Sequence, residues 1–195
     1  MDVLILCTGN ICRSPMAEAL LADELDRRGV AATVHSAGLL DDGRPASAHS
    51  TSLMADRDLD ISTHASRAVT AAMLERADLI IGMERRHVRE AAILVPDSWS
   101  RAFTLRELAR RSLDAGPRPP EVEVADWLAT LVEERTTAEH LGESSSDDVA
   151  DPYGHNLRTY RKCADELDGL IGVVVDHLWP AAEPEADNAI RSTTA

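Results

Sequence analysis

The chain has 195 residues, with 20 Lys or Arg against 34 Asp or Glu, and therefore a formal net charge of −14. This length predicts one domain with a substantial hydrophobic core, and the acidity argues against nucleic acid as a partner. We expect no membrane segment and no export, because no apolar run approaches roughly 18 residues and no charged-then-apolar leader is present.

The first informative stretch follows a short apolar run at residues 3–6, which is typical of a buried strand. Residues 7–14 read CTGNICRS, and Pro15 then opens an amphipathic pattern that predicts a helix. A loop between a strand and a helix directs its backbone N–H groups into one concavity at the positive end of the helix dipole. The stretch therefore predicts a site for a phosphate-sized anion.

The residue types of this loop suit attack on phosphorus. Cys7 offers a thiolate nucleophile, whose anionic form a helix N-terminus and a nearby Arg13 would favour. The guanidinium of Arg13 can grip two phosphoryl oxygens at once, Ser14 can donate to the thiolate, and Gly9 permits a tight turn. The alternative is a structural cysteine at a strand end beside a solvated arginine. The strand before the loop and the helix after it favour the functional interpretation.

Residues 7–19, CTGNICRSPMAEA, resemble the signature of the low-molecular-weight protein tyrosine phosphatases. Asp151, followed by Pro152 and Tyr153, is similar to the aspartate-proline element that the same family carries near the other end of the chain. The resemblance implies Cys7 as nucleophile, Arg13 as the ligand of the phosphoryl oxygens and Asp151 as general acid. We expect the phosphate and substrate to be bound by Thr8, Gly9, Asn10, Ile11, Cys12, Arg13, Ser14 and Tyr153.

Residues 32–36 predict a second strand, and the resemblance implies that Ser36 at its end supports Asn10 of the loop. A simple turn serine is the alternative. Residues 39–45 then depart from the family, because most phosphotyrosine-specific relatives place an aromatic wall there and this loop has none. The residues available to line the pocket instead are Leu39, Leu40 and Arg44.

Further elements continue the alternation of strands and helices. The pattern predicts helices over residues 46–57 and from Thr70 to Arg76, strands over 78–83 and 100–104, and a helix from Glu84. Such alternation predicts a single α/β domain with a parallel sheet, and the resemblance implies four strands flanked by helices. A phosphate loop after the first strand then lies at the carboxyl end of the sheet, where such sheets bind ligands. We expect His87 to lie on a helix surface or to pack.

Residues 114–150 form an acidic insertion relative to typical family members, with 10 acidic against 2 basic residues. Within it, residues 124–140 predict an amphipathic helix, and residues 142–148 predict a polar, mobile loop. Because the insertion leads directly into Asp151, we expect it beside the rim of the active site. It either shapes access to that site or is a tolerated surface insertion.

A long closing helix is predicted over residues 156–178, with Cys163 packed and inert within it. Residues 1–180 are therefore expected to form the phosphatase domain, and residues 181–195 a disordered tail. Three cysteines without disulfide-like spacing fit a reducing cytoplasm, where a thiolate nucleophile survives.

The expected reaction is hydrolysis of phosphotyrosine in a protein or peptide, through a phosphocysteine on Cys7, with inorganic phosphate as product and no metal or cofactor. Protein arginine phosphatases, a bacterial branch of the family, resemble the chain at residues 103–105 and 151–154. They carry threonine where this chain has Ile11. The apolar face of Ile11 suits an aryl ring, so this position favours phosphotyrosine.

Two other functions are alternatives to phosphotyrosine hydrolysis. Arsenate reduction on the same scaffold requires resolving cysteines on a mobile segment, and neither Cys12 within the loop nor Cys163 within a helix suits that relay. A catalytically silent phosphate-binding module would be expected to lack Cys7, Arg13 or Asp151, and all three are present. Phosphotyrosine hydrolysis is therefore the preferred interpretation.

Overall fold

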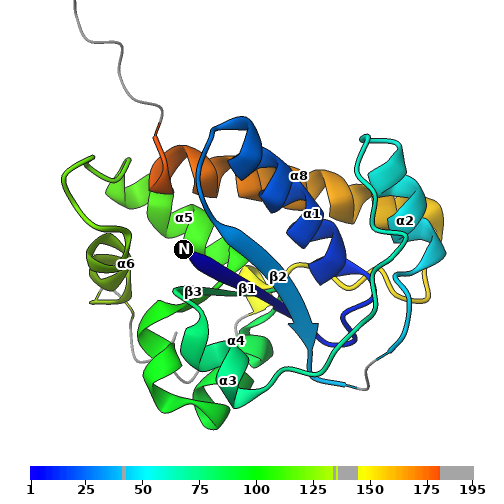
Figure 1. Cartoon of the computed structure of the whole chain (residues 1–195), viewed down its shortest axis with the longest axis horizontal. Helices are drawn as coiled ribbons and strands as arrows, with labels where there is room; N and C mark the ends of the chain where they lie inside the picture. Colours follow the sequence, from blue (N-terminus) through cyan, green and yellow to red (C-terminus); the bar gives the residue numbers. More distant parts are fainter. Residues whose placement is uncertain (41–42, 134, 136–144, 181–195) are drawn as a thin grey trace, which may run out of the picture.

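The computed structural model of the protein describes residues 1–40, 43–133, 135 and 145–180. Strands and helices alternate along most of this length, as the sequence pattern predicts (Figure 1). In chain order the elements are β1 (Asp2–Cys7), α1 (Arg13–Arg27), β2 (Thr33–Gly38), α2 (Ala48–Ala55), α3 (Ala71–Arg76), β3 (Leu79–Gly82), α4 (Arg85–Leu94), the 3₁₀ helix η1 (Pro96–Arg101), β4 (Ala102–Thr104), α5 (Leu105–Ala115), α6 (Val124–Glu133), the 3₁₀ helix η2 (Ser145–Asp147) and α8 (Leu157–Leu178).

The four strands form one parallel sheet in the order β2-β1-β3-β4, which confirms the predicted fold class. β1 is central, and its last residue, Cys7, lies opposite Gly38 at the end of β2. On the other side Leu6 pairs with Gly82, the last residue of β3. The carboxyl ends of three strands therefore meet around Cys7, where the chain has its candidate chemistry.

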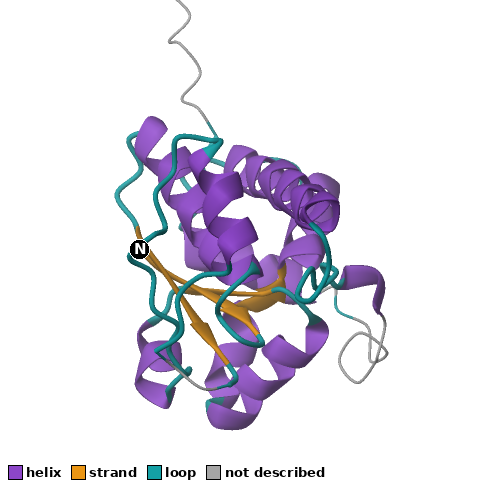
Figure 2. Cartoon of the chain, turned by 90° about the vertical axis from the view of Figure 1, so that its right-hand side faces the viewer, coloured by secondary structure: helices purple, strands orange, loops and turns teal. Residues whose placement is uncertain are grey.

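Helices cover both faces of the sheet (Figure 2). Successive side chains of a strand point to opposite faces, so Val3 and Ile5 pack into a core with α1, α5 and α8, while Leu4 and Leu6 pack with α3 and α4. All four side chains are essentially unexposed. Burial on both faces explains why β1 reads as a continuous apolar run rather than as an alternating pattern.

Several predicted elements are shorter than expected; α2 and β3 lose one or two residues at each end, and two others differ more. Residues 100 and 101 belong to η1 rather than to a strand, and the guanidinium of Arg101 donates to the carbonyl oxygens of Ala77 and Asp97. β4 therefore begins at Ala102. The predicted helix over 124–140 ends at Glu133; Arg135 lies outside it, and the rest of that prediction lies outside the described residues.

Arg135 ties the insertion to the core. Its Nε donates to Glu107 Oε1 at 2.8 Å, and its guanidinium carbon lies 4.6 Å from the ring centroid of Trp99 and 4.5 Å from that of Phe103. Glu107 has no exposed surface and also pairs with Arg85 at 2.8 Å and with Arg111 at 3.2 Å. One carboxylate therefore joins α4, α5 and the insertion.

Among the described helices, none combines the length and the apolar character that crossing a membrane requires.

The first prediction concerns the Glu107 carboxylate. Burial alone would raise the pKa of Glu107, but Arg135 and Arg85 outweigh burial and lower it. Removal of one partner from a buried ionic network costs about 3–5 kcal/mol, so we expect Glu107→Gln to lose stability of that order at neutral pH. The measurement is the free energy of unfolding in urea, with Glu75→Gln on the exposed surface of α3 as control.

The stabilisation by Glu107 should depend on pH in a definite direction. Because the folded-state pKa of Glu107 is lowered, its stabilisation is complete above the unfolded-state value of about 4.3 and is lost as the pH falls toward the folded-state pKa. The stability difference between wild type and Glu107→Gln should therefore shrink on acidification below about pH 4. A constant difference across that range would contradict the assignment.

Candidate active site

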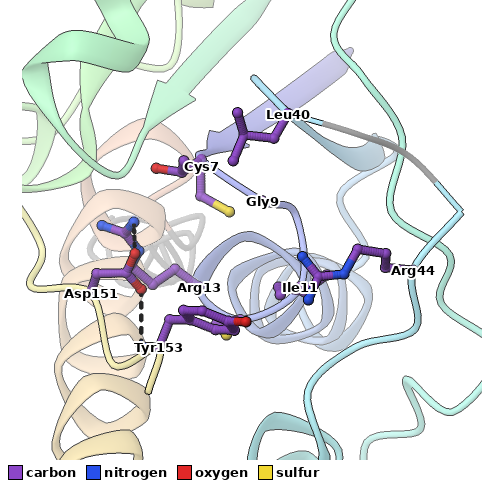
Figure 3. A pocket seen from close by; sticks show the side chains of 10 residues that line it. Cys7, Gly9, Ile11, Arg13, Leu40, Arg44, Asp151 and Tyr153 are labelled. Atoms are coloured by element: carbon purple, nitrogen blue, oxygen red, sulfur yellow. Dashed lines mark hydrogen bonds and ion pairs between the residues drawn. The ribbon is translucent and has the colours of Figure 1, made fainter. Parts of the chain in front are cut away.

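The loop between β1 and α1 forms the floor of a pocket (Figure 3). Cys7 ends β1 and Arg13 begins α1, and Asn10 between them has a left-handed backbone, with φ of 49°. The pocket has a volume of about 90 Å³. It is lined by Cys7, Thr8, Gly9, Ile11, Cys12, Arg13, Leu40, Arg44, Asp151 and Tyr153.

The sulfur of Cys7 receives directed hydrogen bonds. The backbone N–H of Asn10 donates to Sγ over 3.1 Å, and Ser14 Oγ lies 3.0 Å from it. Ser14 Oγ already accepts a hydrogen bond from Asn10 Nδ2 at 2.8 Å, so its own proton is free for the sulfur. Both donors stabilise negative charge on Sγ. This is the role that the sequence suggested for Ser14.

Asn10 is held through every polar atom of its side chain. Nδ2 donates to Ser14 and, at 2.7 Å, to Ser36 Oγ, while Oδ1 accepts from the backbone N–H of Arg67 at 3.0 Å. His64 Nε2 lies 2.7 Å from the carbonyl oxygen of Asn10, which can only accept. These bonds fix a residue whose backbone conformation is unfavourable for most side chains. Ser36 therefore supports Asn10, as the resemblance implied.

Arg13 is a buried cation with three acceptors, two carboxylates and one backbone carbonyl oxygen. Its Nη1 pairs with Glu84 and donates to the carbonyl oxygen of Val149 at 2.8 Å, and its Nη2 pairs with Asp151 at 2.9 Å. Burial alone would lower the pKa of Arg13, but Asp151 and Glu84 outweigh burial and raise it, so the group stays charged. Its Nε is buried and has no partner among the described residues. One donor of the guanidinium is therefore unpaired in this structure.

Asp151 reaches this pocket from the far end of the chain. Its side chain is 40% exposed, its Oδ2 pairs with Arg13, and its Oδ1 accepts from the backbone N–H of Tyr153 at 3.2 Å (Figure 3). The structure thus brings together the three residues singled out for chemistry, Cys7, Arg13 and Asp151.

The walls of the pocket are apolar with one cation. Ile11, Leu40 and Tyr153 line it, and Arg44 directs its guanidinium toward it from the side opposite Asp151 (Figure 3). Two of the three residues expected to replace the aromatic wall, Leu40 and Arg44, are therefore at the pocket. Leu39 instead donates its backbone N–H to the carbonyl oxygen of Thr8 at 2.8 Å.

His87 and Glu84 are contacts of the loop that the sequence did not indicate. Of the two positions expected for His87, the structure shows the packed one: the residue is fully buried, and burial lowers its pKa to about 3, so it is neutral. Its Nδ1 accepts from the backbone N–H of Glu84, so Nε2 carries the proton and donates to Thr8 Oγ1 over 3.2 Å. A histidine in a helix of mixed polarity gives no sequence signal of such a contact.

The remaining cysteines pack near the loop. Cys12 Sγ lies 3.2 Å from Tyr160 Oη, and burial raises the pKa of Cys163 to about 12. All three thiols are free and buried. Within the described part of the chain, no group of three or more His, Cys, Asp or Glu residues is placed to hold a metal ion.

In sequence, the chain is similar to known phosphatases. The family model described as low molecular weight phosphotyrosine protein phosphatase matches residues 2–127. A protein named protein-arginine-phosphatase from Bacillus subtilis is 28% identical over 172 residues, covering 88% of this chain and 92% of that protein. A probable low molecular weight protein-tyrosine-phosphatase, EpsP, from Ralstonia solanacearum is 36% identical over 129 residues, covering 66% of this chain and 87% of that protein.

The fold agrees with the same group. The crystal structure of a low molecular weight protein tyrosine phosphatase from T. tengcongensis superposes with a TM-score of 0.68 at 31% identity, covering 90% of this chain and 98% of that one.

The second prediction concerns Gly38, where β2 approaches the loop. A Cβ at this position would lie 2.9 Å from the carbonyl oxygen of Thr8 and 3.0 Å from the backbone nitrogen of Asn10. We expect Gly38→Ala to displace the loop, to destabilise the fold by about 1–3 kcal/mol and to weaken binding of inorganic phosphate. Calorimetry of phosphate binding and thermal unfolding measure the two effects.

Gly172 of α8 provides a matched control, because a Cβ there meets nothing within 4 Å. Gly172→Ala should leave phosphate binding unchanged and stabilise the helix by about 0.5–1 kcal/mol. Equal phosphate affinity in Gly38→Ala and wild type would show that the close approach does not shape the loop.

Proposed function

The chain belongs to the low-molecular-weight phosphotyrosine protein phosphatase family, and we propose that it hydrolyses phosphotyrosine in proteins through a phosphocysteine on Cys7. The observation that carries this proposal is the arrangement in one pocket of a hydrogen-bonded thiol, a buried guanidinium with a free Nε, and a carboxylate. Each group supplies what one stage of phosphoryl transfer requires.

In the first step, the Cys7 thiolate attacks phosphorus in line with the bond to the leaving oxygen. Arg13 binds phosphoryl oxygens through Nε and through the Nη2 that Asp151 occupies in the free enzyme, while the loop N–H groups and the N-terminus of α1 bind the others. The S–P bond forms as the P–O bond breaks, and protonated Asp151 gives its proton to the phenolic oxygen.

In the second step, Asp151 is a carboxylate and takes a proton from the attacking water. The new P–O bond forms, the S–P bond breaks, and the electron pair returns to Cys7 as thiolate, which the Asn10 N–H and the Ser14 hydroxyl stabilise. Inorganic phosphate leaves. We place this reaction in the cytoplasm, where a reducing environment preserves a thiolate nucleophile.

The pocket walls support phosphotyrosine as the substrate. Ile11, Leu40 and Tyr153 offer apolar surface to an aryl ring. A phosphoarginine would instead place its own positively charged guanidino group in a pocket where Arg44 already directs one. Phosphoarginine hydrolysis remains the second candidate, because the arginine phosphatase of Bacillus subtilis matches 88% of this chain, including residues beyond the family model.

The third prediction tests the nucleophile. Cys7→Ser should lower kcat/KM for an aryl phosphate by at least about a thousandfold while inorganic phosphate still binds, because the loop and Arg13 remain. Rapidly acid-quenched wild-type enzyme should carry a phosphoryl group on Cys7 by mass spectrometry. Cys163→Ser, within α8, is the control and should keep its activity. Turnover by Cys7→Ser comparable to wild type would contradict the mechanism.

The fourth prediction tests the substrate. Wild type should prefer a phosphotyrosine peptide to a phosphoarginine peptide of otherwise identical sequence. Ile11→Thr should reduce that preference by about tenfold or more in the ratio of kcat/KM values, because it removes apolar surface facing the ring and adds a hydroxyl. Ile11→Val keeps the apolar face and should keep the preference. A preference for phosphoarginine in wild type would overturn the substrate assignment.

A further inference from the structure

The segment that precedes Asp151 is anchored far more firmly than Asp151 itself. We propose that Asp147 and Asp148 are positioning residues, which set the place of the Asp151 carboxyl by fixing the backbone that leads to it. We call residues 145–151 the acid arm. This inference rests on the proposed function, in which Asp151 is the general acid.

Asp148 and Val149 dock the acid arm on the carboxyl end of the sheet. The backbone N–H of Arg85, the first residue of α4, donates to Asp148 Oδ1 at 2.7 Å. The next residue, Val149, donates its N–H to the carbonyl oxygen of Met83 at 2.8 Å and accepts from Arg13 Nη1 at 2.8 Å. Its side chain has no exposed surface. These contacts fix the chain two residues before Asp151 against the arginine that binds the phosphoryl group.

Asp147 anchors the same arm to the core. Its Oδ2 accepts from Arg85 Nη2 at 3.0 Å and from Arg110 Nη2 at 3.3 Å, and only 7% of the residue is exposed. Arg85 connects Asp147 to the core, since its Nη1 also donates to the fully buried Glu107 at 2.8 Å. The sequence predicted a mobile polar loop at residues 142–148. The part of it that the structure describes, from residue 145, instead contains the buried Arg85–Asp147 ion pair and accepts a hydrogen bond from the Arg85 N–H at Asp148.

Asp151 depends on this anchoring once a substrate is bound. In the free enzyme its carboxylate is held by Arg13 Nη2, a donor that a phosphoryl group would need. When the phosphoryl group takes that donor, Asp151 loses its ion pair and keeps the hydrogen bond from the Tyr153 N–H. The backbone of the acid arm then decides where the carboxyl lies relative to the leaving oxygen. A displacement of about 1 Å in such a group can cost on the order of 100-fold in rate.

Leaving groups of different basicity distinguish positioning from general structural support. A phenolate with a high pKa must be protonated as it departs, whereas para-nitrophenolate leaves readily without a proton. Loss of Asp151 placement therefore lowers kcat/KM for phenyl phosphate more than for para-nitrophenyl phosphate. Partial unfolding or a damaged phosphate loop would lower both values equally.

The test compares kcat/KM for the two phosphates in Asp148→Ala, Asp148→Asn and Asp147→Asn, on the full chain. We expect Asp148→Ala to lower the ratio of phenyl to para-nitrophenyl phosphate by about tenfold. Asp148→Asn keeps an oxygen that accepts from Arg85 N–H and should recover most of that ratio. Asp168→Ala, on the exposed surface of α8, removes the same charge elsewhere and should leave the ratio unchanged.

Asp151→Asn separates this inference from the function on which it rests. If Asp151→Asn leaves the ratio unchanged, Asp151 is not the general acid and the proposed function fails at that residue. If Asp151→Asn lowers the ratio but Asp148→Ala does not, the positioning inference is wrong. Adding Asp148→Ala to Asp151→Asn should lower the ratio no further, because both changes act through one carboxyl; an additive loss would overturn the inference.

Thermal unfolding will show whether Asp148→Ala folds. If it does not, a variant of Asp147 tests the inference instead. Asp147→Asn retains the volume of the side chain and weakens only its charge interaction with Arg85 and Arg110. It should lower the same ratio by about two- to fivefold. Equal losses for the two phosphates would show that Asp147 acts only on stability.

Discussion

A guanidinium buried in the core constrains the rest of this structure. Arg13 is 1% exposed, and burial of a charge costs much free energy unless opposite charges and hydrogen-bond acceptors surround it. Glu84 at the start of α4 supplies one partner, and the acid arm supplies two, the carbonyl oxygen of Val149 and the Asp151 carboxylate. The need to satisfy one cation therefore assembles the phosphate loop, the β3–α4 junction and the acid arm around one pocket.

The positive charge of Arg13 lets an acidic protein bind an anionic substrate. The chain carries a net charge of −14, which opposes the approach of a phosphoprotein at long range. Salt screens exposed charges over about 8 Å, so the field inside the pocket comes mainly from nearby groups. Arg13, the N-terminus of α1 and Arg44 supply positive charge there, and Asp151 partly offsets it until a phosphoryl group binds.

The insertion is integrated into the fold rather than appended to its surface. Arg135 and Asp147 enter a buried network with Arg85 and Glu107, so the stretch that lengthens this chain also braces α4, α5 and the acid arm. The two ends of the insertion lie in different places: Asp148 and Val149 contact the β3–α4 junction beside the site, whereas α6 packs against η1, which precedes β4. Composition could not reveal this, because acidic residues in a polar segment predict solvent exposure unless their distant partners are known.

The sequence by itself determined the parallel α/β fold and the phosphate loop. Both depend on interactions between residues close together in the chain: the apolar periodicity of each strand and helix, and the residue types from Cys7 to Ser14. Asp151 was identified only through its resemblance to a family element. The tertiary structure alone decided that His87 is buried against Thr8, that Glu84 pairs with Arg13, and that Asp147 is an anchor. Each of those contacts joins residues far apart in the chain, and only the packing of the sheet and helices brings such residues together.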